Sequence, residues 1–247
     1  MKDTEKRISR LLHERKTLLF ALFDSENIAN IADFGKRATA CDVDAFLVGG
    51  STASDQLQLD HAVKTLKENV KQPVILFPGN ITGISRHADA IFFSSLLNSD
   101  DPYFIIGAQA LGSLVVKNYN LEAIPMGYII AGPGAAAGFV GRARPFPEDK
   151  PELVALYALA AQYLGMRFIY LEAGSGASAT ISIQTIKAVR KVYDGTLIVG
   201  GGIRSAQVAH KIAEAGADII VIGNMLETAN FEHQLKAISQ AIHSNTH

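Results

Sequence analysis

The 247-residue chain has one cysteine and almost no net charge, and both absences exclude classes of protein. Cys41 alone can form neither an internal disulfide nor a multi-cysteine metal site. With 23 Lys and Arg against 24 Asp and Glu, the chain has no strong field to attract nucleic acid or an anionic membrane. We therefore expect a cytoplasmic protein that does not bind nucleic acid.

Long apolar runs are also lacking. The N-terminal residues MKDTEKRISRLLHERK are charged throughout, which is not typical of a signal peptide, and residues 1–15 are expected to form an amphipathic helix. The longest weakly polar stretch, MGYIIAGPGAAAGFVG, is shorter than the roughly 18 residues that a transmembrane helix needs, and Pro and Gly interrupt it. A hydrophobic substrate would then be met from water or in transient contact with a membrane surface.

What the chain does contain is a series of short apolar runs, most of them followed by a helical pattern. The predicted strands are 17–23, 43–48, 73–77, 89–93, 122–130, 167–171, 196–200 and 218–222. The predicted helices between them are 54–70, 102–117, 151–164, 181–193, 205–215 and 225–243. The runs are continuous rather than alternating, which is typical of parallel strands buried on both faces.

Eight such strands in about 250 residues predict one domain. They favour a (β/α)8 TIM barrel rather than the alternative, a doubly wound open sheet. One unit is irregular. Only PGNITGISRHA (78–88) separates the third and fourth strands, which is barely enough for a crossover helix, so a loop or a single turn is expected there.

In a barrel the active site lies where the strands end, so the residues after each strand are the candidates. The glycines of GGGIRS and VIGN follow the last two strands, where backbone N–H groups can approach a phosphate, although glycine is also a common turn residue. Asp24 follows the first strand. With Ser51 it has the oxygen ligands that Mg²⁺ accepts, or it caps the next helix.

Small and aromatic residues supply candidates for an apolar groove. Around the fourth and fifth strands these are Phe92, Phe93, Tyr103, Phe104 and Phe139, which also suit an ordinary core. The connection 131–150 is unusually long and holds Arg142 and Arg144, so it is either a basic lid over an anionic substrate or a plain surface loop. His243 and His247 are interpreted as solvated residues of a polar tail.

Five motifs in order, YLEAGSG, GGGIRS, IVIGN, Asp24 after the first strand and VGGST after the second, resemble the geranylgeranylglyceryl phosphate synthase family, which includes the heptaprenylglyceryl phosphate synthases. The likeness covers about residues 15 to 230. It implies a modified TIM barrel with a reduced third helix. It also implies a Mg²⁺-dependent prenyltransferase that joins sn-glycerol 1-phosphate to a polyprenyl diphosphate, expected to be geranylgeranyl diphosphate, in membrane phospholipid biosynthesis.

The resemblance also implies site residues. Asp24 and Ser51 would bind Mg²⁺, although Ser25 stands where the family commonly has Pro. Glu172 would be the general base that takes a proton from the glycerol hydroxyl. The residues implied to bind glycerol 1-phosphate are Tyr170, Leu171, Glu172, Ala173, Gly174, Ser175, Gly176, Gly201, Gly202, Gly223 and Asn224.

Tyr157 and Tyr163 could make the contacts between subunits of a homo-oligomer, either a dimer or a hexamer. Alternatively, they are core or half-exposed surface residues of their helix. Two alternatives to the prenyltransferase are another phosphate-binding barrel enzyme, such as a sugar-phosphate isomerase or synthase, and a non-catalytic barrel that binds phosphorylated ligands.

Overall fold

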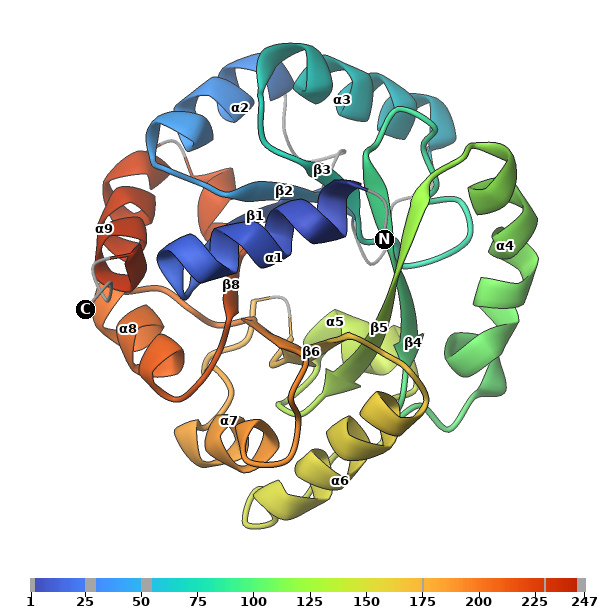
Figure 1. Ribbon diagram of the computed structural model, residues 1–247, viewed down its shortest axis with the longest axis vertical. Coiled ribbons are helices and arrows are strands. Elements are labelled where there is room, and N and C mark those ends of the chain that lie inside the picture. Colours follow the sequence, from blue (N-terminus) through green and yellow to red (C-terminus); the bar gives the residue numbers. More distant parts are fainter. Residues whose placement is uncertain (1–2, 25–29, 50–54, 175, 229, 244–247) are drawn as a thin grey trace.

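All eight predicted strands are present and pair in parallel, in chain order, into a closed barrel. The computed structural model describes residues 3–24, 30–49, 55–174, 176–228 and 230–243 (Figure 1). The strands are β1 (Leu18–Phe23), β2 (Ala45–Val48), β3 (Val74–Leu76), β4 (Ala90–Leu96), β5 (Glu122–Ile130), β6 (Phe168–Glu172), β7 (Thr196–Gly200) and β8 (Ile219–Ile222). Pairing of Leu18 with Ile219 closes the ring, which confirms the TIM barrel.

Helices surround the barrel, and several differ from those predicted. They are α1 (Asp3–Arg15), α2 (Ile31–Ala40), α3 (Gln56–Asn69), the π-helix η1 (Tyr103–Gly107), α4 (Ala108–Asn118), α5 (Ala135–Val140), α6 (Pro151–Tyr163), α7 (Ile183–Arg190), α8 (Ala206–Glu214), the 3-10 helix η2 (Asn224–Glu227) and α9 (Phe231–His243). The sequence did not predict α2 or α5, and the predicted helix 225–243 is two helices. Across the described ranges, none of the helices combines the length and hydropathy that crossing a bilayer requires.

Two hydrophobic cores, one inside the barrel and one between the barrel and its helices, explain why the strand sequences are continuously apolar. Residues such as Phe20, Phe92 and Tyr170 point into the barrel, and their neighbours in sequence pack outward against the helices. Because side chains alternate along a strand, every position is buried when both faces are covered.

The predicted irregular unit is confirmed. Residues 77–89, all of them described, connect β3 to β4 with turns and no helix. The barrel helix that would follow β3 is therefore reduced to turns, as the resemblance implied. Residues of this connection and of α4, among them Ile84 and Gly112, line the same cavity.

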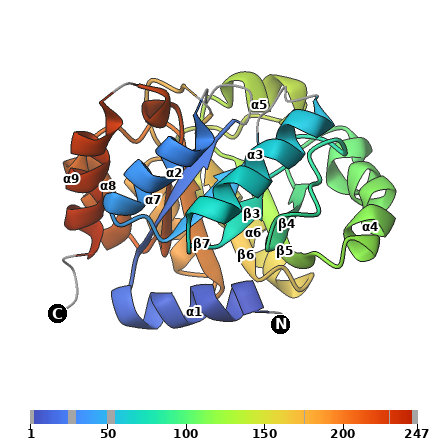
Figure 2. The same cartoon turned by 90° about the horizontal axis from the view of Figure 1, so that it is seen from above.

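Helix α1 lies across the N-terminal end of the barrel, opposite α5 (Figure 2). Ile8 packs with the interior core and is 1% exposed. The carboxylate of Glu122 accepts the N–H groups of Thr4 (2.7 Å) and Glu5 (3.3 Å), at the positive end of the helix dipole. Arg167 pairs with the buried Glu5 carboxylate at 2.5 Å. These contacts fix α1 as a plug at this end.

The same end carries a repeated aspartate. Asp44, Asp89 and Asp218 precede β2, β4 and β8, and each carboxylate accepts the N–H of a residue at the start of the preceding strand at 2.7–2.8 Å. A cation pairs with each, namely Arg15, Lys67 and Arg190. The aspartates therefore fix the register of three strand pairs away from the open end.

His243 is not solvated as predicted. Its side chain is 12% exposed, and its ring nitrogens lie 3.0 Å from carboxylate oxygens of Asp42 and Asp44. Both partners are about 200 positions earlier in the chain, so the end of α9 is fastened to the plugged end of the barrel. His247 lies outside the described residues.

Candidate functional site

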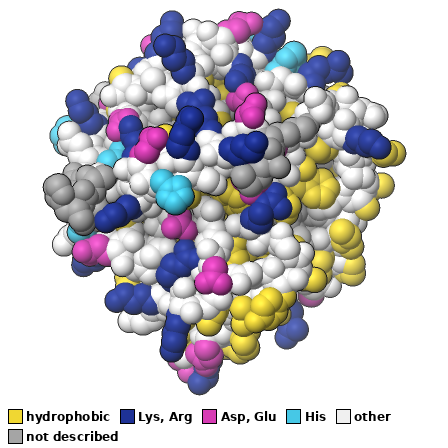
Figure 3. All heavy atoms as spheres, in the orientation of Figure 1, with side chains coloured by type: hydrophobic (Ala, Val, Ile, Leu, Met, Phe, Trp, Pro, Cys, Tyr) yellow, Lys and Arg dark blue, Asp and Glu magenta, His cyan; other side chains and the backbone are white. Residues whose placement is uncertain are grey.

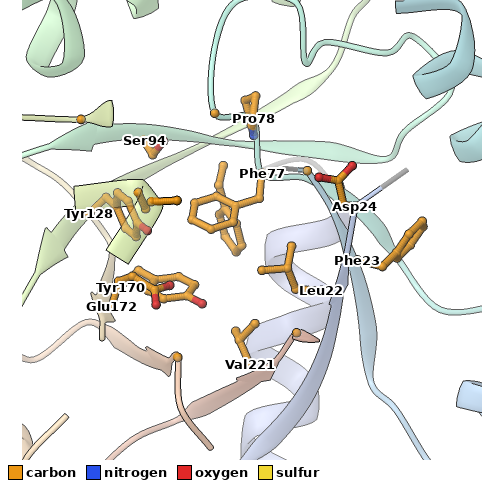
Figure 4. Close-up of a pocket in the computed structure, with 18 of the residues that line it drawn as sticks. Leu22, Phe23, Asp24, Phe77, Pro78, Ser94, Tyr128, Tyr170, Glu172 and Val221 are labelled. Atoms are coloured by element: carbon orange, nitrogen blue, oxygen red, sulfur yellow. The ribbon is translucent and has the colours of Figure 1, made fainter. Parts of the chain in front are cut away.

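A cavity of about 700 Å³ opens at the C-terminal end of the barrel, where the sequence placed the site. One part lies among the residues that end or follow β1, β6, β7 and β8 (Figure 4), and another is lined by residues of the 78–88 connection and of α4. The first part is polar and the second is apolar. The arrangement thus provides one continuous space with two chemically different ends.

Glu172 ends β6 in the polar part and is 6% exposed. Its Oε1 accepts the N–H of Gly174 at 2.6 Å, and the hydroxyls of Tyr170 and Tyr128 hydrogen-bond to the carboxylate. Burial raises the pKa of Glu172 above its ordinary value, and these hydrogen bonds partly oppose the rise because they stabilise the charged form. A carboxylate with a raised pKa, held in place by donors, is suited to accept a proton.

Three aromatic rings stand beside this carboxylate. Phe77 stacks on Tyr170 with centroids 5.1 Å apart, and Tyr128 meets both rings edge to face at 5.4 Å. Burial, followed by the nearby Glu172 charge, raises the pKa of both tyrosines well above the ordinary value, so they remain donors. The rings lie where the polar part meets the apolar part (Figure 4).

The glycine loops after β6 and β7 form a tight cradle. Gly174, Gly176, Gly201 and Gly202 all have positive φ, between 70° and 116°. A Cβ on Gly201 would overlap Glu172 Oε1, and one on Gly202 would lie 2.6 Å from the carbonyl oxygen of Ala179. Glycine is required here by close approach as well as by φ, which leaves backbone dipoles exposed to an anion.

Two side chains tie these loops together. Asn224 Oδ1 accepts the N–H of Gly176 at 3.2 Å, and the Arg204 guanidinium donates to the carbonyl oxygen of Ala177 at 3.1 Å. Both side chains line the cavity, so Arg204 adds a positive charge at this end. The sequence had left Arg204 unassigned.

Asp24 lines the cavity after β1, across Phe77 from Glu172 in Figure 4. It does not cap α2, because that helix begins at Ile31 and its N-cap is Asn30. Ser51 and Ser25 lie outside the described residues. Among the described residues there is no group of three or more His, Cys, Asp or Glu that could hold a metal ion.

The apolar part follows one face of α4. Ala108, Gly112 and Val116 recur every four residues and line the cavity, as do Ile84 and Phe93. A Cβ on Gly112 would lie 3.2 Å from Ile84 Cδ1, so the missing side chain widens the passage. Phe92 and Phe104 also line the cavity, as the groove prediction required.

Some predicted residues do not reach the cavity. The side chains of Leu171 and Ala173 pack in the outer core, because neighbours in a strand point to opposite faces. Tyr170, Gly176, Gly201, Gly202, Gly223 and Asn224 do line it, Gly174 supports Glu172, and Ser175 lies outside the described residues.

The connection 131–150 is tied down rather than free to act as a basic lid. Ala143 pairs with Ser99, and Asn98 donates to the carbonyl oxygen of Arg144 at 2.9 Å. Arg142 pairs with Asp100 at 3.2 Å, and neither arginine is among the described residues that line the cavity. The part that does line it is α5.

Sequence reasoning missed Phe77, Tyr128 and Gly112. Tyr128 is the register partner of Tyr170, and both lie two residues before the end of the strand, so strand alternation could have placed both rings inward. Nothing in the local sequence distinguishes Gly112 from an ordinary helix glycine.

Comparison with known proteins gives a consistent result. Residues 11–242 match the PcrB family. Geranylgeranylglyceryl phosphate synthase of Cenarchaeum symbiosum is 50% identical over 98% of this chain and 99% of its own, and that of Pyrococcus furiosus is 53% identical over 90% and 91%. The crystal structure of (S)-3-O-geranylgeranylglyceryl phosphate synthase from Thermoplasma acidophilum in complex with sn-glycerol-1-phosphate superimposes with a TM-score of 0.91, at 35% identity, over 96% of this chain and 98% of that one.

Proposed function

The chain belongs to the PcrB family, and we propose that it is a prenyltransferase that joins sn-glycerol 1-phosphate to a polyprenyl diphosphate, expected to be geranylgeranyl diphosphate, in membrane phospholipid biosynthesis. The observation that carries this proposal is one continuous cavity with a buried carboxylate and glycine cradle at one end and an apolar passage at the other. A small phosphorylated alcohol and a long hydrocarbon fit these two ends.

Glycerol 1-phosphate would lie in the polar part. Its phosphate would meet the backbone N–H groups of the Gly201 and Gly223 loops and the charge of Arg204. Its free primary hydroxyl would then point toward Glu172, because the phosphate anchors the opposite end of the molecule.

The polyprenyl chain would run along α4, past Phe104 and Gly112. Its allylic C1 would lie near Phe77, Tyr128 and Tyr170, next to the bound hydroxyl. The hydroxyl oxygen forms a bond to C1, the bond from C1 to the diphosphate oxygen breaks, and diphosphate leaves with the electron pair. Glu172 takes the hydroxyl proton, so charge and atoms balance.

Mg²⁺ fits the residues at the mouth. Mg²⁺ in proteins commonly takes one or two carboxylates and leaves its other positions to water and substrate phosphate, and Asp24 offers one carboxylate facing the cavity. Asp24, with Ser51, would hold the ion, which when bound supplies charge neutralisation for the leaving diphosphate. Asp24→Asn should raise the Mg²⁺ concentration needed for half-maximal turnover, and an unchanged Mg²⁺ requirement would remove Asp24 from this role.

Homo-oligomer formation is part of the proposal, and α6 supports it. Val154, Ala158 and Ala161 face the barrel, while a second apolar stripe faces outward, namely Leu153 (36% exposed), Leu156 (60%), Tyr157 (39%), Tyr163 (79%) and the following Leu164 (75%). Hydrophobic side chains gather over α6 and α4 in Figure 3. A helix that is apolar on both faces is usually covered on both.

One assay tests the function. The protein is incubated with Mg²⁺, labelled glycerol 1-phosphate and prenyl diphosphates of several lengths, and the lipid-soluble label is extracted. We expect a labelled ether lipid and released diphosphate. Both the sugar-phosphate enzyme and the non-catalytic barrel predict no lipid-soluble product at any chain length, and that result would overturn the proposal.

A further inference from the structure

Gly200 ends β7 directly opposite Glu172, and its backbone does not require a glycine. The two residues are register partners in the parallel pair β6–β7. The φ of Gly200 lies outside the positive range, unlike that of Gly201, so any residue could adopt this strand conformation. Ile198, two positions earlier, points into the interior core, and a side chain at position 200 would point inward as well. The barrel interior therefore lacks a side chain beside Glu172.

The tip of the Tyr170 ring lies in the space that Gly200 leaves. A Cβ on Gly200 would overlap the Tyr170 hydroxyl, and it would lie 2.7 Å from Cζ and 2.9 Å from Cε1 of the same ring. These are the three heavy atoms nearest to the added Cβ, and all of them belong to Tyr170. The contact with Tyr170 therefore explains why position 200 is a glycine.

The other sides of the Tyr170 ring are already occupied. Phe77 stacks on it with the two planes 16° apart, and Tyr128 meets it edge to face (Figure 4). Tyr170 is only 1% exposed, so the ring has no open space to turn into. A methyl group at position 200 would therefore move the Tyr170 hydroxyl away from the Glu172 carboxylate to which it hydrogen-bonds.

We propose that Gly200 is a positioning residue for the transfer reaction, because it leaves the room that keeps the Tyr170 hydroxyl on the carboxylate of Glu172. The reaction in this inference rests on the proposed function, whereas the contact does not. Among the described residues, the other titratable groups that line the cavity with Glu172 are Asp24, Tyr128, Tyr170, Arg204 and Glu227. Only the Tyr170 hydroxyl overlaps the added Cβ.

The hydroxyl matters because it stabilises the charged form of the base. The hydrogen bond from Tyr170 lowers the pKa of Glu172 and so opposes the rise that burial causes. Without this donor, Glu172 would remain protonated to higher pH and could accept the proton of the acceptor hydroxyl only above that pH. A glycine that served packing alone would have no such effect on the pH dependence.

Gly195 provides a matched control just before β7. A Cβ on Gly195 would overlap the hydroxyl of Tyr193, and it would lie 2.6 Å from Cζ of that ring and 2.7 Å from the carbonyl oxygen of Arg167. Tyr193 packs in the outer core, and its hydroxyl donates to the carbonyl oxygen of Met166 at 3.2 Å. Gly195→Ala therefore displaces a buried tyrosine hydroxyl that makes no contact with the site.

The first measurement is turnover across pH at saturating substrate. Gly200→Ala should lower kcat about tenfold at neutral pH, as expected for one lost hydrogen bond to a charged group, and move the acid limb of the profile to higher pH. Tyr170→Phe should move the limb in the same direction, and adding Gly200→Ala to it should change kcat little further. Gly195→Ala should keep the wild-type profile. A wild-type profile in Gly200→Ala, or losses that multiply in the double variant, would overturn the proposal.

The second measurement, urea unfolding across pH, does not require the reaction. Because loss of a donor raises the pKa of Glu172 further, Gly200→Ala should lose more stability than the wild type between pH 4.5 and about 8. Gly195→Ala should lose the same amount as the wild type over this range, and an equal loss in Gly200→Ala would contradict the positioning role. Wild-type protein that forms no lipid product, with this stability difference intact, would overturn only the prenyltransferase proposal.

A rescue variant covers the case in which Gly200→Ala does not fold. Tyr170→Leu removes the tip of the ring, so Gly200→Ala combined with Tyr170→Leu should fold if the overlap with Tyr170 is the cause. Recovery of cooperative thermal unfolding in the combined variant supports the proposal. Failure of the combined variant to fold, when Tyr170→Leu alone folds, would show that position 200 contacts something other than Tyr170 and would overturn it.

Discussion

Gly201 permits a quantitative test of how the cradle supports Glu172. Gly201 and Gly165 have almost the same positive φ, 84° and 86°. An alanine in this region costs about 1–2 kcal/mol. At Gly165 a Cβ would have nothing within 4 Å, so Gly165→Ala should lose only that amount. At Gly201 the Cβ would also overlap Glu172 Oε1 and lie 2.9 Å from the Gly174 nitrogen, so the carboxylate must move.

Gly201→Ala should therefore unfold at lower urea than Gly165→Ala, and its turnover should fall about 100-fold, because a base displaced by about 1 Å loses that much. Turnover of Gly165→Ala should match the wild type. The measurements are urea unfolding and turnover at saturating substrate. Equal turnover in the two variants would refute the reasoning, since it would mean that the Gly201 contact does not position Glu172.

Substitutions at three further positions give testable outcomes. Glu172→Gln should cut turnover about 100- to 10,000-fold with little change in glycerol 1-phosphate affinity. Because burial raises the pKa of Glu172, the stability that this group contributes is lost as pH rises above its ordinary value of 4.5. The wild type should therefore lose more stability than the variant over this range, as read from urea unfolding across pH. Gly112→Phe should shorten the longest prenyl chain accepted, as read from product chromatography, since the side chain would fill the passage beside Ile84. His243→Ala should lower the free energy of unfolding by about 1–3 kcal/mol, and the exposed His233→Ala by less than about 0.5 kcal/mol.

The strands were predictable because both faces of each are buried, which leaves an unbroken apolar signal. Helix α2 gave no such signal. Its buried positions, Ile31, Phe34, Gly35 and Ala38, nevertheless recur at helical spacing, so an amphipathic helix could have been predicted here although two of the four residues are small. Packing against a neighbouring helix explains the glycine at position 35, since a Cβ there would lie 2.7 Å from Leu66 Cδ1 of α3.

Site residues were predictable where a motif lies on one loop and were missed where the partner is distant. Glu172 and its glycines are contiguous with YLEAGSG. Tyr128 reaches the same carboxylate from β5, more than forty positions earlier in the chain. Within its own strand, Tyr128 cannot be distinguished from a core residue. His243 likewise meets Asp42 and Asp44 only through the fold. Short-range patterns contain no information on such pairings.

The aspartates before β2, β4 and β8 divide the barrel into two-strand units. Each carboxylate bonds the backbone of the strand that directly precedes its own, so β1–β2, β3–β4 and β7–β8 each contain their own fastening. New chain ends placed between units would leave these bonds within a continuous segment, and ends placed inside a unit would separate donor from acceptor. Circular permutants opened before β3 should therefore tolerate the change better than those opened before β4.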